Sequence, residues 1–211
     1  MFPPIFPIYI PALAFLTPYA TLAWFFGVLF LWLTRYTHQL GARWGGHYYL
    51  LSMVVRPAGI LLILVGWLAL YVPEYAVGSF RLGLLPRRNS VDIVCWLAII
   101  LFSALGVWSV ATLGLRRSFL YRRTDDPLIT RGPYRIVRHP QFLSAIGLTF
   151  FGIQLFNPAG FSFALYGNLG ANWSLFALSL WVLALVEERE LLTHFGEDYR
   201  EYAQRVPRVL P

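Results

Sequence analysis

The chain has 211 residues, of which 58% are hydrophobic and 13% charged, and its mean hydropathy is +0.59. Soluble domains carry about 25% charged residues, so the composition excludes an ordinary soluble domain and predicts an integral membrane protein. The formal net charge is +7, and all 17 basic residues are Arg. Because the Arg residues flank apolar segments, we expect them to meet anionic lipid headgroups, and we do not expect nucleic acid as a partner.

Five apolar segments have the length of membrane-spanning helices, for which about 17–25 residues are needed. Pro11 and Pro18 are expected in the first turns of the first segment or at a kink in it. Arg56-Pro57 is expected to interrupt the start of the second, so that Arg56 extends toward the membrane surface. The segments cover residues 8–33, 50–72, 91–113, 140–156 and 161–186, with a weak point at 167–172 in the last.

The connections between these segments divide the chain into two regions. Residues 35–49 contain Gly41, Gly45 and Gly46 as helix breakers, and residues 73–90 are predicted to form a loop. Asn157-Pro158-Ala159-Gly160 predicts a turn, so the last two spans should form a helical hairpin. The predicted fold is therefore all-α: residues 1–113 with three spans, then residues 114–211 with an Arg-rich connection, the hairpin and a C-terminal amphipathic helix.

The distribution of Arg residues predicts the orientation, because basic residues accumulate in cytoplasmic loops. With five spans, 13 Arg lie in the connections after the first and third spans and after the fifth, against three between residues 73 and 90. The imbalance predicts a multi-pass protein in which residues 114–139 and the C-terminal segment lie together on the cytoplasmic side.

Polar residues concentrate between residues 128 and 142, directly before an apolar segment. Tyr134 and Arg138 are four residues apart, which places them on one face if the segment is helical. His139 precedes a helix that is predicted to begin at Pro140, and the free N–H groups of such a helix start can hold an anion. Considered one by one, these residues are also explained as an interfacial aromatic anchor, a headgroup contact and a helix cap.

A second polar segment, residues 187–202, follows the fifth span. It opens with Glu187 and Glu188, which are also explained as charge that is solvated where the span leaves the bilayer. Gly196 is expected to end one helix before another begins. The second helix carries an apolar stripe suited to the membrane surface, formed by Tyr199, Tyr202 and Val206. No Cys/His spacing typical of a metal site occurs, so we do not expect a metal.

The two motifs, in this order, resemble those of the isoprenylcysteine carboxyl methyltransferase family, and the chain looks like a short member of prokaryotic type. These integral membrane enzymes use S-adenosylmethionine and are related to the phospholipid methyltransferases. The resemblance implies methyl transfer to a lipophilic acceptor from the bilayer, such as a carboxylate, a thiol or a lipid headgroup. The matching residues are Gly132-Pro133-Tyr134, Arg138-His139-Pro140, Glu187-Glu188, Phe195-Gly196, Tyr199, Tyr202 and Pro207.

The resemblance also implies roles for individual residues. Glu187 would hold the amino group of the cofactor, and Arg138 would orient an anionic acceptor or the cofactor carboxylate. Arg138 and Glu188 are the candidate catalytic residues. The implied cofactor-binding residues are Pro127, Leu128, Ile129, Tyr134, His139, Pro140, Gln141, Phe142 and Glu187.

Two positions depart from the family pattern. Phe142 stands where many members have Tyr, and Leu183 stands near where members that methylate prenylcysteine carry Arg. The acceptor therefore stays open. Two other readings remain: an enzyme like the NADPH-dependent membrane sterol and steroid reductases, which have a related C-terminal arrangement, and a membrane scaffold that has lost activity. The acidic pair followed by Phe195-Gly196 and the two Tyr residues favours methyl transfer.

Overall fold

A computed structural model describes residues 16–33, 44–77, 89–120, 126–156 and 167–209. Every regular element within these ranges is helical, which confirms the predicted all-α class for the described part of the chain. The elements are α2 (Leu16–Leu33), α4 (Gly46–Val77), α5 (Asn89–Leu113), the π-helical turn η1 (Arg116–Leu120), the 3-10 turn η2 (Gly132–Arg135), α6 (Pro140–Phe156), α7 (Gly167–Phe195) and α8 (Glu197–Arg205).

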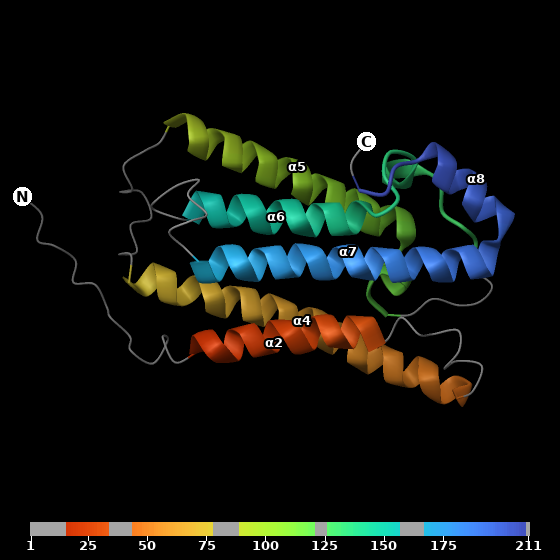
Figure 1. The fold of residues 1–211 in the computed structure, drawn as a ribbon, viewed down its shortest axis with the longest axis horizontal. Coiled ribbons are helices and arrows are strands. Elements are labelled where there is room, and N and C mark those ends of the chain that lie inside the picture. Colours follow the sequence, from red (N-terminus) through yellow and green to blue (C-terminus); the bar gives the residue numbers. More distant parts are fainter. Residues whose placement is uncertain (1–15, 34–43, 78–88, 121–125, 157–166, 210–211) are drawn as a thin grey trace, which may run out of the picture.

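The five long helices run roughly along the long axis of the molecule (Figure 1). Helix α6 lies between α5 and α7 and packs against both, while α2 packs along α4. Helix α7 extends farther than α6 at one end, and there α8 and the short turn η2 lie beside it (Figure 1). The two polar segments of the sequence therefore meet at the same end of the helical array.

Two of the described helices contain stretches long and apolar enough to cross a membrane. These are Gly46–Gly66 in α4 and Ser90–Leu113 in α5, and α6 contributes a shorter apolar stretch, Pro140–Leu155. Only 24% of the first stretch and 11% of the second are buried within the protein, which leaves apolar surface suited to lipid. The five spans stay a prediction, as does the hairpin, because its turn at 157–160 lies outside the described residues.

Three local predictions in these helices were wrong. Helix α4 continues through Arg56-Pro57 and Pro73 instead of breaking there, as prolines in spanning helices do when neighbouring groups satisfy the freed backbone. Arg56 is only 6% exposed, so it is held inside the protein and does not extend to the membrane surface. Residues 167–172, predicted to be a weak point, form the first turns of α7.

Glycines permit the closest helix contacts. A Cβ atom on Gly27 of α2 would lie 2.6 Å from the carbonyl oxygen of Gly59 on α4. A Cβ on Gly147 of α6 would lie 2.5 Å from the ring of Phe102 on α5. Small residues at such crossings let helix backbones approach each other, which is how helices associate in a membrane.

Candidate functional site

The site is built where α6 begins and α7 ends. Helix α6 starts at Pro140 and α7 ends at Phe195, as the sequence predicts. Gly196 adopts φ +56°, a left-handed conformation that glycine adopts readily. The chain then turns into α8. The residues that follow α8 return to α6: Pro207 accepts a backbone N–H from Arg138 (2.9 Å), and Arg208 accepts one from His139 (3.1 Å).

His139 lies between the two carboxylates of the acidic pair. Its Nδ1 is 3.4 Å from Glu187 Oε2, and its Nε2 is 3.2 Å from Glu188 Oε1. Burial alone would lower the pKa of this imidazole, but the hydrogen bonds and charges of Glu187 and Glu188 outweigh it and raise the pKa of His139 above its ordinary value. An imidazolium can donate from both nitrogens, so this arrangement favours the charged form.

Glu188 is held from three sides. Arg208 binds it with both arms of the guanidinium, Nε to Oε1 at 2.8 Å and Nη2 to Oε2 at 2.7 Å. Arg138 Nη1 lies 3.0 Å from the same Oε1. Burial would raise the pKa of this carboxyl group, but the hydrogen bonds from His139 and Arg208 and the charge of Arg138 lower the pKa of Glu188 to about 2. Glu188 is therefore ionised at neutral pH.

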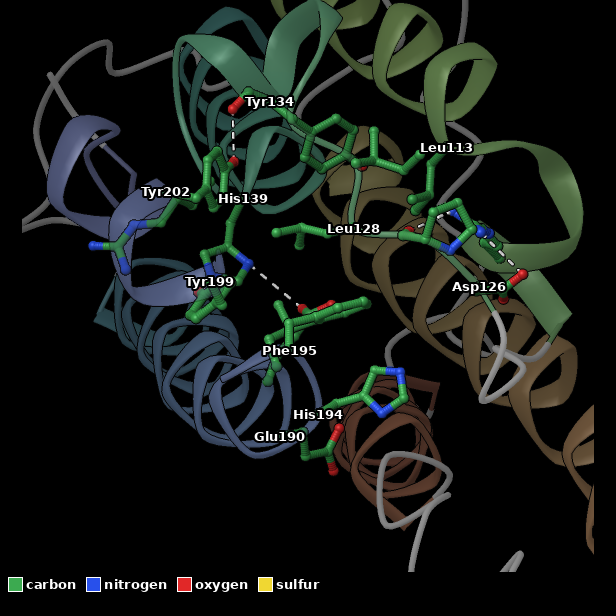
Figure 2. A pocket seen from close by; sticks show the side chains of 16 residues that line it. Leu113, Asp126, Leu128, Tyr134, His139, Glu190, His194, Phe195, Tyr199 and Tyr202 are labelled. Carbon is green, nitrogen blue, oxygen red and sulfur yellow. Dashed lines mark hydrogen bonds and ion pairs between the residues drawn. The ribbon is translucent and has the colours of Figure 1, made fainter. Parts of the chain in front are cut away.

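A pocket with a cavity volume of about 90 Å³ opens beside this cluster. In Figure 2, Tyr134, His139 and Tyr202 lie on one side of it, and Leu113 and Asp126 lie on the other. Its walls combine carboxylates, cations, aromatic rings and apolar side chains. They are formed by Leu113, Arg117, Asp126, Pro127, Leu128, Ile129, Tyr134, Arg138, His139, Glu187, Glu190, Leu191, His194, Phe195, Tyr199 and Tyr202.

Asp126 fixes another part of the pocket wall. Its carboxylate pairs with Arg116 and with Arg117, whose Nη2 lies 2.9 Å away. Arg117 also donates to the carbonyl oxygen of Pro127, at 3.2 Å. These contacts bind the π-helical turn that follows α5 to the segment that leads into η2.

The aromatic stripe of α8 packs inside the protein and not on a membrane surface, so that prediction was wrong. Tyr199, Tyr202 and Val206 are 3%, 5% and 7% exposed, and Leu128 and Phe195 pack against them. Burial raises the pKa of Tyr199 to about 12, and the charge of Glu188 acts in the same direction. Both phenols are therefore neutral at physiological pH, since burial raises the pKa of Tyr202 as well.

Seven of the eleven candidate catalytic and cofactor-binding residues line the pocket: Pro127, Leu128, Ile129, Tyr134, Arg138, His139 and Glu187. Four others, Pro140, Gln141, Phe142 and Glu188, are not part of its wall. Gln141 donates to Ser118 Oγ at 2.8 Å, and the ring of Phe142 stacks on that of His139 with centroids 5.4 Å apart. These two side chains support the site from outside.

The sequence did not single out Asp126, Glu190, His194 or Arg208. Asp126 stands in an Asp-Asp-Pro triplet beside an Arg-rich turn, and this pattern in the sequence could have predicted its ion pairs. Glu190 and His194 are one turn apart on α7, on the face that Glu187 occupies. Arg208 had no local signal, because its partner Glu188 lies 20 residues away. Within the described residues, no three His, Cys, Asp or Glu side chains are grouped to hold a metal ion.

The comparisons with known proteins concern the part of the chain that builds this site. The family model described as phospholipid methyltransferase matches residues 91–198. Protein-S-isoprenylcysteine O-methyltransferase B of Arabidopsis thaliana is 36% identical over 123 residues, 54% of this chain and 55% of the relative. Methanethiol S-methyltransferase 2 of Bradyrhizobium diazoefficiens is 33% identical over 106 residues, 46% of this chain and 36% of the relative.

Protein-S-isoprenylcysteine O-methyltransferase of Schizosaccharomyces pombe is 32% identical over 94 residues, 43% of this chain and 35% of the relative. The chain thus spans about half of the plant relative and about a third of the other two. No solved structure matches. The family model covers half of the chain, from α5 through the acidic pair and the start of α8. The chain belongs to the phospholipid methyltransferase family, and it is similar to enzymes named as isoprenylcysteine and methanethiol methyltransferases.

Proposed function

We propose that this protein is a membrane methyltransferase that uses S-adenosylmethionine and methylates a lipophilic acceptor. The observation that carries the proposal is the position of the pocket. It is lined by Tyr134, His139 and Glu187, three residues inside the region that the family model matches. The named activities of the relatives, O-methylation of an isoprenylcysteine protein and S-methylation of methanethiol, support the same class of reaction.

The residues around the pocket fit the parts of this cofactor. Glu187 offers a carboxylate for the amino group. Arg138 Nε and the Tyr199 hydroxyl, both buried, have no hydrogen-bond partner within the described residues and suit the carboxylate of a ligand. Tyr134 and Phe195 offer aromatic surface for an adenine ring.

The cavity is small for such a ligand, because pockets for small molecules usually measure roughly 300–1,000 Å³. Binding must therefore separate some of the lining side chains. His194 is exposed and Glu190 and Leu191 are half-buried. We propose that this part of the α7 wall yields, because Glu187 is held by His139 and the wall at Asp126 is held by Arg116 and Arg117.

When bound, the cofactor supplies a methyl group on a sulfonium for in-line attack by the acceptor. The task of the protein is then mainly to position, and well-aligned geometry can contribute up to about 7–11 kcal/mol. His139, held between two carboxylates, keeps Glu187 fixed at the pocket wall. Arg138 pairs with Glu188 and orients an anionic group through its free Nε. An acceptor that is already an anion, such as a carboxylate or thiolate, requires no strong base.

An open groove lined mainly by apolar residues of α5 and α6 supports entry of the acceptor from the lipid bilayer. It has a volume of about 740 Å³, its lining includes Gly106, Val107 and Leu148, and it reaches Gly114 and Phe119. Gly114 directly follows Leu113, which lines the pocket. Leu183 stands near the position where related enzymes carry Arg, and as an apolar side chain that is 1% exposed in the helical core it offers no charge to an acceptor. The acceptor class therefore stays a carboxylate, a thiol or a lipid headgroup.

We extend the proposal to the membrane topology. The protein crosses the bilayer several times, and the pocket faces the cytoplasm, where the donor is available. The charge distribution supports this, since Arg116, Arg117 and Arg138 lie on the pocket end of the molecule and basic residues favour the cytoplasmic face.

Binding of S-adenosylhomocysteine, the demethylated form of the cofactor, to purified protein tests the proposal. We expect saturable binding that Tyr134→Ala, His139→Ala and Glu187→Ala each weaken. Absence of binding to the wild type, or normal binding by all three variants, would sink it. NADPH is titrated in parallel, because protection by NADPH alone would favour a reductase. Turnover with labelled methyl donor and a panel of lipids, thiols and prenylated cysteines identifies the acceptor, and donor binding without turnover on any of them would favour a scaffold.

A further inference from the structure

The residues after α8 connect the two halves of the site through Arg208. The backbone oxygen of Arg208 accepts the N–H of His139, which immediately precedes α6. Its guanidinium binds both oxygens of Glu188, which stands on α7. One residue thus fixes the start of α6 and the end of the long helix α7 relative to each other.

The direction of the guanidinium is itself fixed. The Arg208 Cζ atom lies 5.3 Å from the ring centroid of Trp181, a distance at which a cation is attracted to an aromatic face. A planar fork that binds both oxygens of a carboxylate also defines the plane of that carboxylate. Glu188 therefore keeps one orientation, with Oε1 directed at His139 Nε2.

We propose that Arg208 is a positioning residue for the donor site: it holds Glu188, and through Glu188 it holds His139 where Glu187 remains at the pocket wall. This inference rests on the proposed function. Arg208 is not among the residues that line the pocket, so it acts through its partners and not by contact with a ligand. It also lies beyond residues 91–198, which the family model matches.

Loss of Arg208 changes the balance around His139. Glu188 would keep only Arg138 and His139 as partners, and its carboxylate would be free to rotate toward them. His139 bridges the two carboxylates, so a shift of Glu188 displaces the imidazole from Glu187. The ligand-binding carboxylate then loses its fixed place at the pocket wall.

The experiment compares three variants of the full chain in detergent or nanodiscs by titration with S-adenosylhomocysteine. We expect Arg208→Gln to weaken binding roughly tenfold or more, the lower end of what loss of an orienting partner of a ligand-binding residue does in metal sites. Arg208→Lys should restore part of the affinity, since it keeps the charge and loses the fork. Arg205→Gln is the matched control: it removes the same charge nearby, from an exposed side chain that donates to the backbone oxygen of Glu201.

The pH dependence of binding separates positioning from general loss of structure. Without Arg208, Glu188 takes up a proton at a higher pH, so affinity in Arg208→Gln should fall at a higher pH on acidification than in the wild type or Arg205→Gln. The titratable and charged groups that face Glu188 are Arg138 and His139 before α6, Glu187 on α7, Tyr199 on α8 and Arg208 itself.

The inference would be overturned if Arg208→Gln binds S-adenosylhomocysteine with wild-type affinity and loses that affinity at the same pH as the wild type on acidification. If that variant does not fold, Arg208→Lys decides, and wild-type affinity there would overturn it equally. If the wild-type protein does not bind S-adenosylhomocysteine, the proposed function fails separately. Thermal unfolding at acid pH then tests the link between Arg208 and Glu188. If the unfolding temperature of Arg208→Lys falls at a higher pH than that of the wild type, and that of Arg205→Gln does not, the link is supported. If Arg208→Lys shows no such shift, the link is contradicted.

Discussion

The hydroxyl of Tyr202 donates a hydrogen bond of 2.6 Å to the backbone oxygen of Tyr134. The two residues are 68 positions apart, and this bond attaches α8 to the turn η2 above the pocket. Both side chains line the pocket and both are buried. The C-terminal helix is therefore part of the pocket wall, held there by a polar contact as well as by apolar packing.

Tyr202→Phe should lower the free energy of unfolding by about 0.5–1.5 kcal/mol, because it removes the buried hydrogen bond to the backbone oxygen of Tyr134. Unfolding by denaturant, followed by fluorescence, measures the change. Tyr199→Phe is the control on the same helix, since the Tyr199 hydroxyl has no hydrogen-bond partner within the described residues. A Tyr199→Phe variant as unstable as Tyr202→Phe would show that ring packing, and not the bond to Tyr134, holds α8.

The charge of His139 should make stability depend on pH near neutrality. Its pKa in the folded protein is raised above 6.5, so the stabilisation is fully present below that pH. It is lost as pH rises through the higher folded value. Thermal unfolding between pH 6 and 9 should therefore show a decline in the wild type that is absent in His139→Gln. A decline of equal size in the variant would assign it to another group.

Close packing of α2 against α4 depends on Gly27. Gly27→Ala would place a Cβ 2.6 Å from the backbone oxygen of Gly59, so α2 and α4 must move apart. We expect a loss of about 1–3 kcal/mol, measured by unfolding in a titration with a denaturing detergent. Gly46→Ala is the matched control, because nothing lies within 4 Å of its Cβ position. Equal effects of the two changes would argue against this contact.

Asp126 should matter for ligand binding more than for stability. Asp126→Asn removes the charge that pairs with Arg116 and Arg117, and both ion pairs are partly exposed, so the loss of stability should stay near 1 kcal/mol or less. The pocket wall is loosened, and affinity for S-adenosylhomocysteine should fall severalfold. Asp198→Asn, an exposed change in α8, provides the comparison. Unchanged affinity in Asp126→Asn would show that this wall is not part of the ligand site.

Local signals in the sequence predicted the parts of the site that depend on neighbouring residues. Pro140 marked the start of α6, because proline suits a first helical position. Gly196 marked the end of α7, because the chain there needs a positive φ. The Arg distribution predicted that the segments of Tyr134, His139 and Glu187 lie on the same side, and these three residues line one pocket.

Features that depend on distant partners could not be predicted in this way. Arg56 was expected at the membrane surface, but tertiary contacts bury it. The spacing of Tyr199 and Tyr202 on α8 suits packing against a membrane surface as well as against the protein. Only the fold shows that this stripe faces the protein. The pairing of Arg208 with Glu188 requires the chain to reverse after α8, which no local pattern encodes.

We propose that the methyl donor binds in the pocket that Tyr134, His139 and Glu187 line. Ultraviolet crosslinking of S-adenosylmethionine carrying a labelled methyl group, followed by mapping of the labelled peptides, tests this most directly. We expect label on peptides from residues 126–139 or 187–202, suppressed by excess S-adenosylhomocysteine and reduced in Glu187→Ala. Label confined to other peptides, or label that excess S-adenosylhomocysteine does not displace, would contradict it.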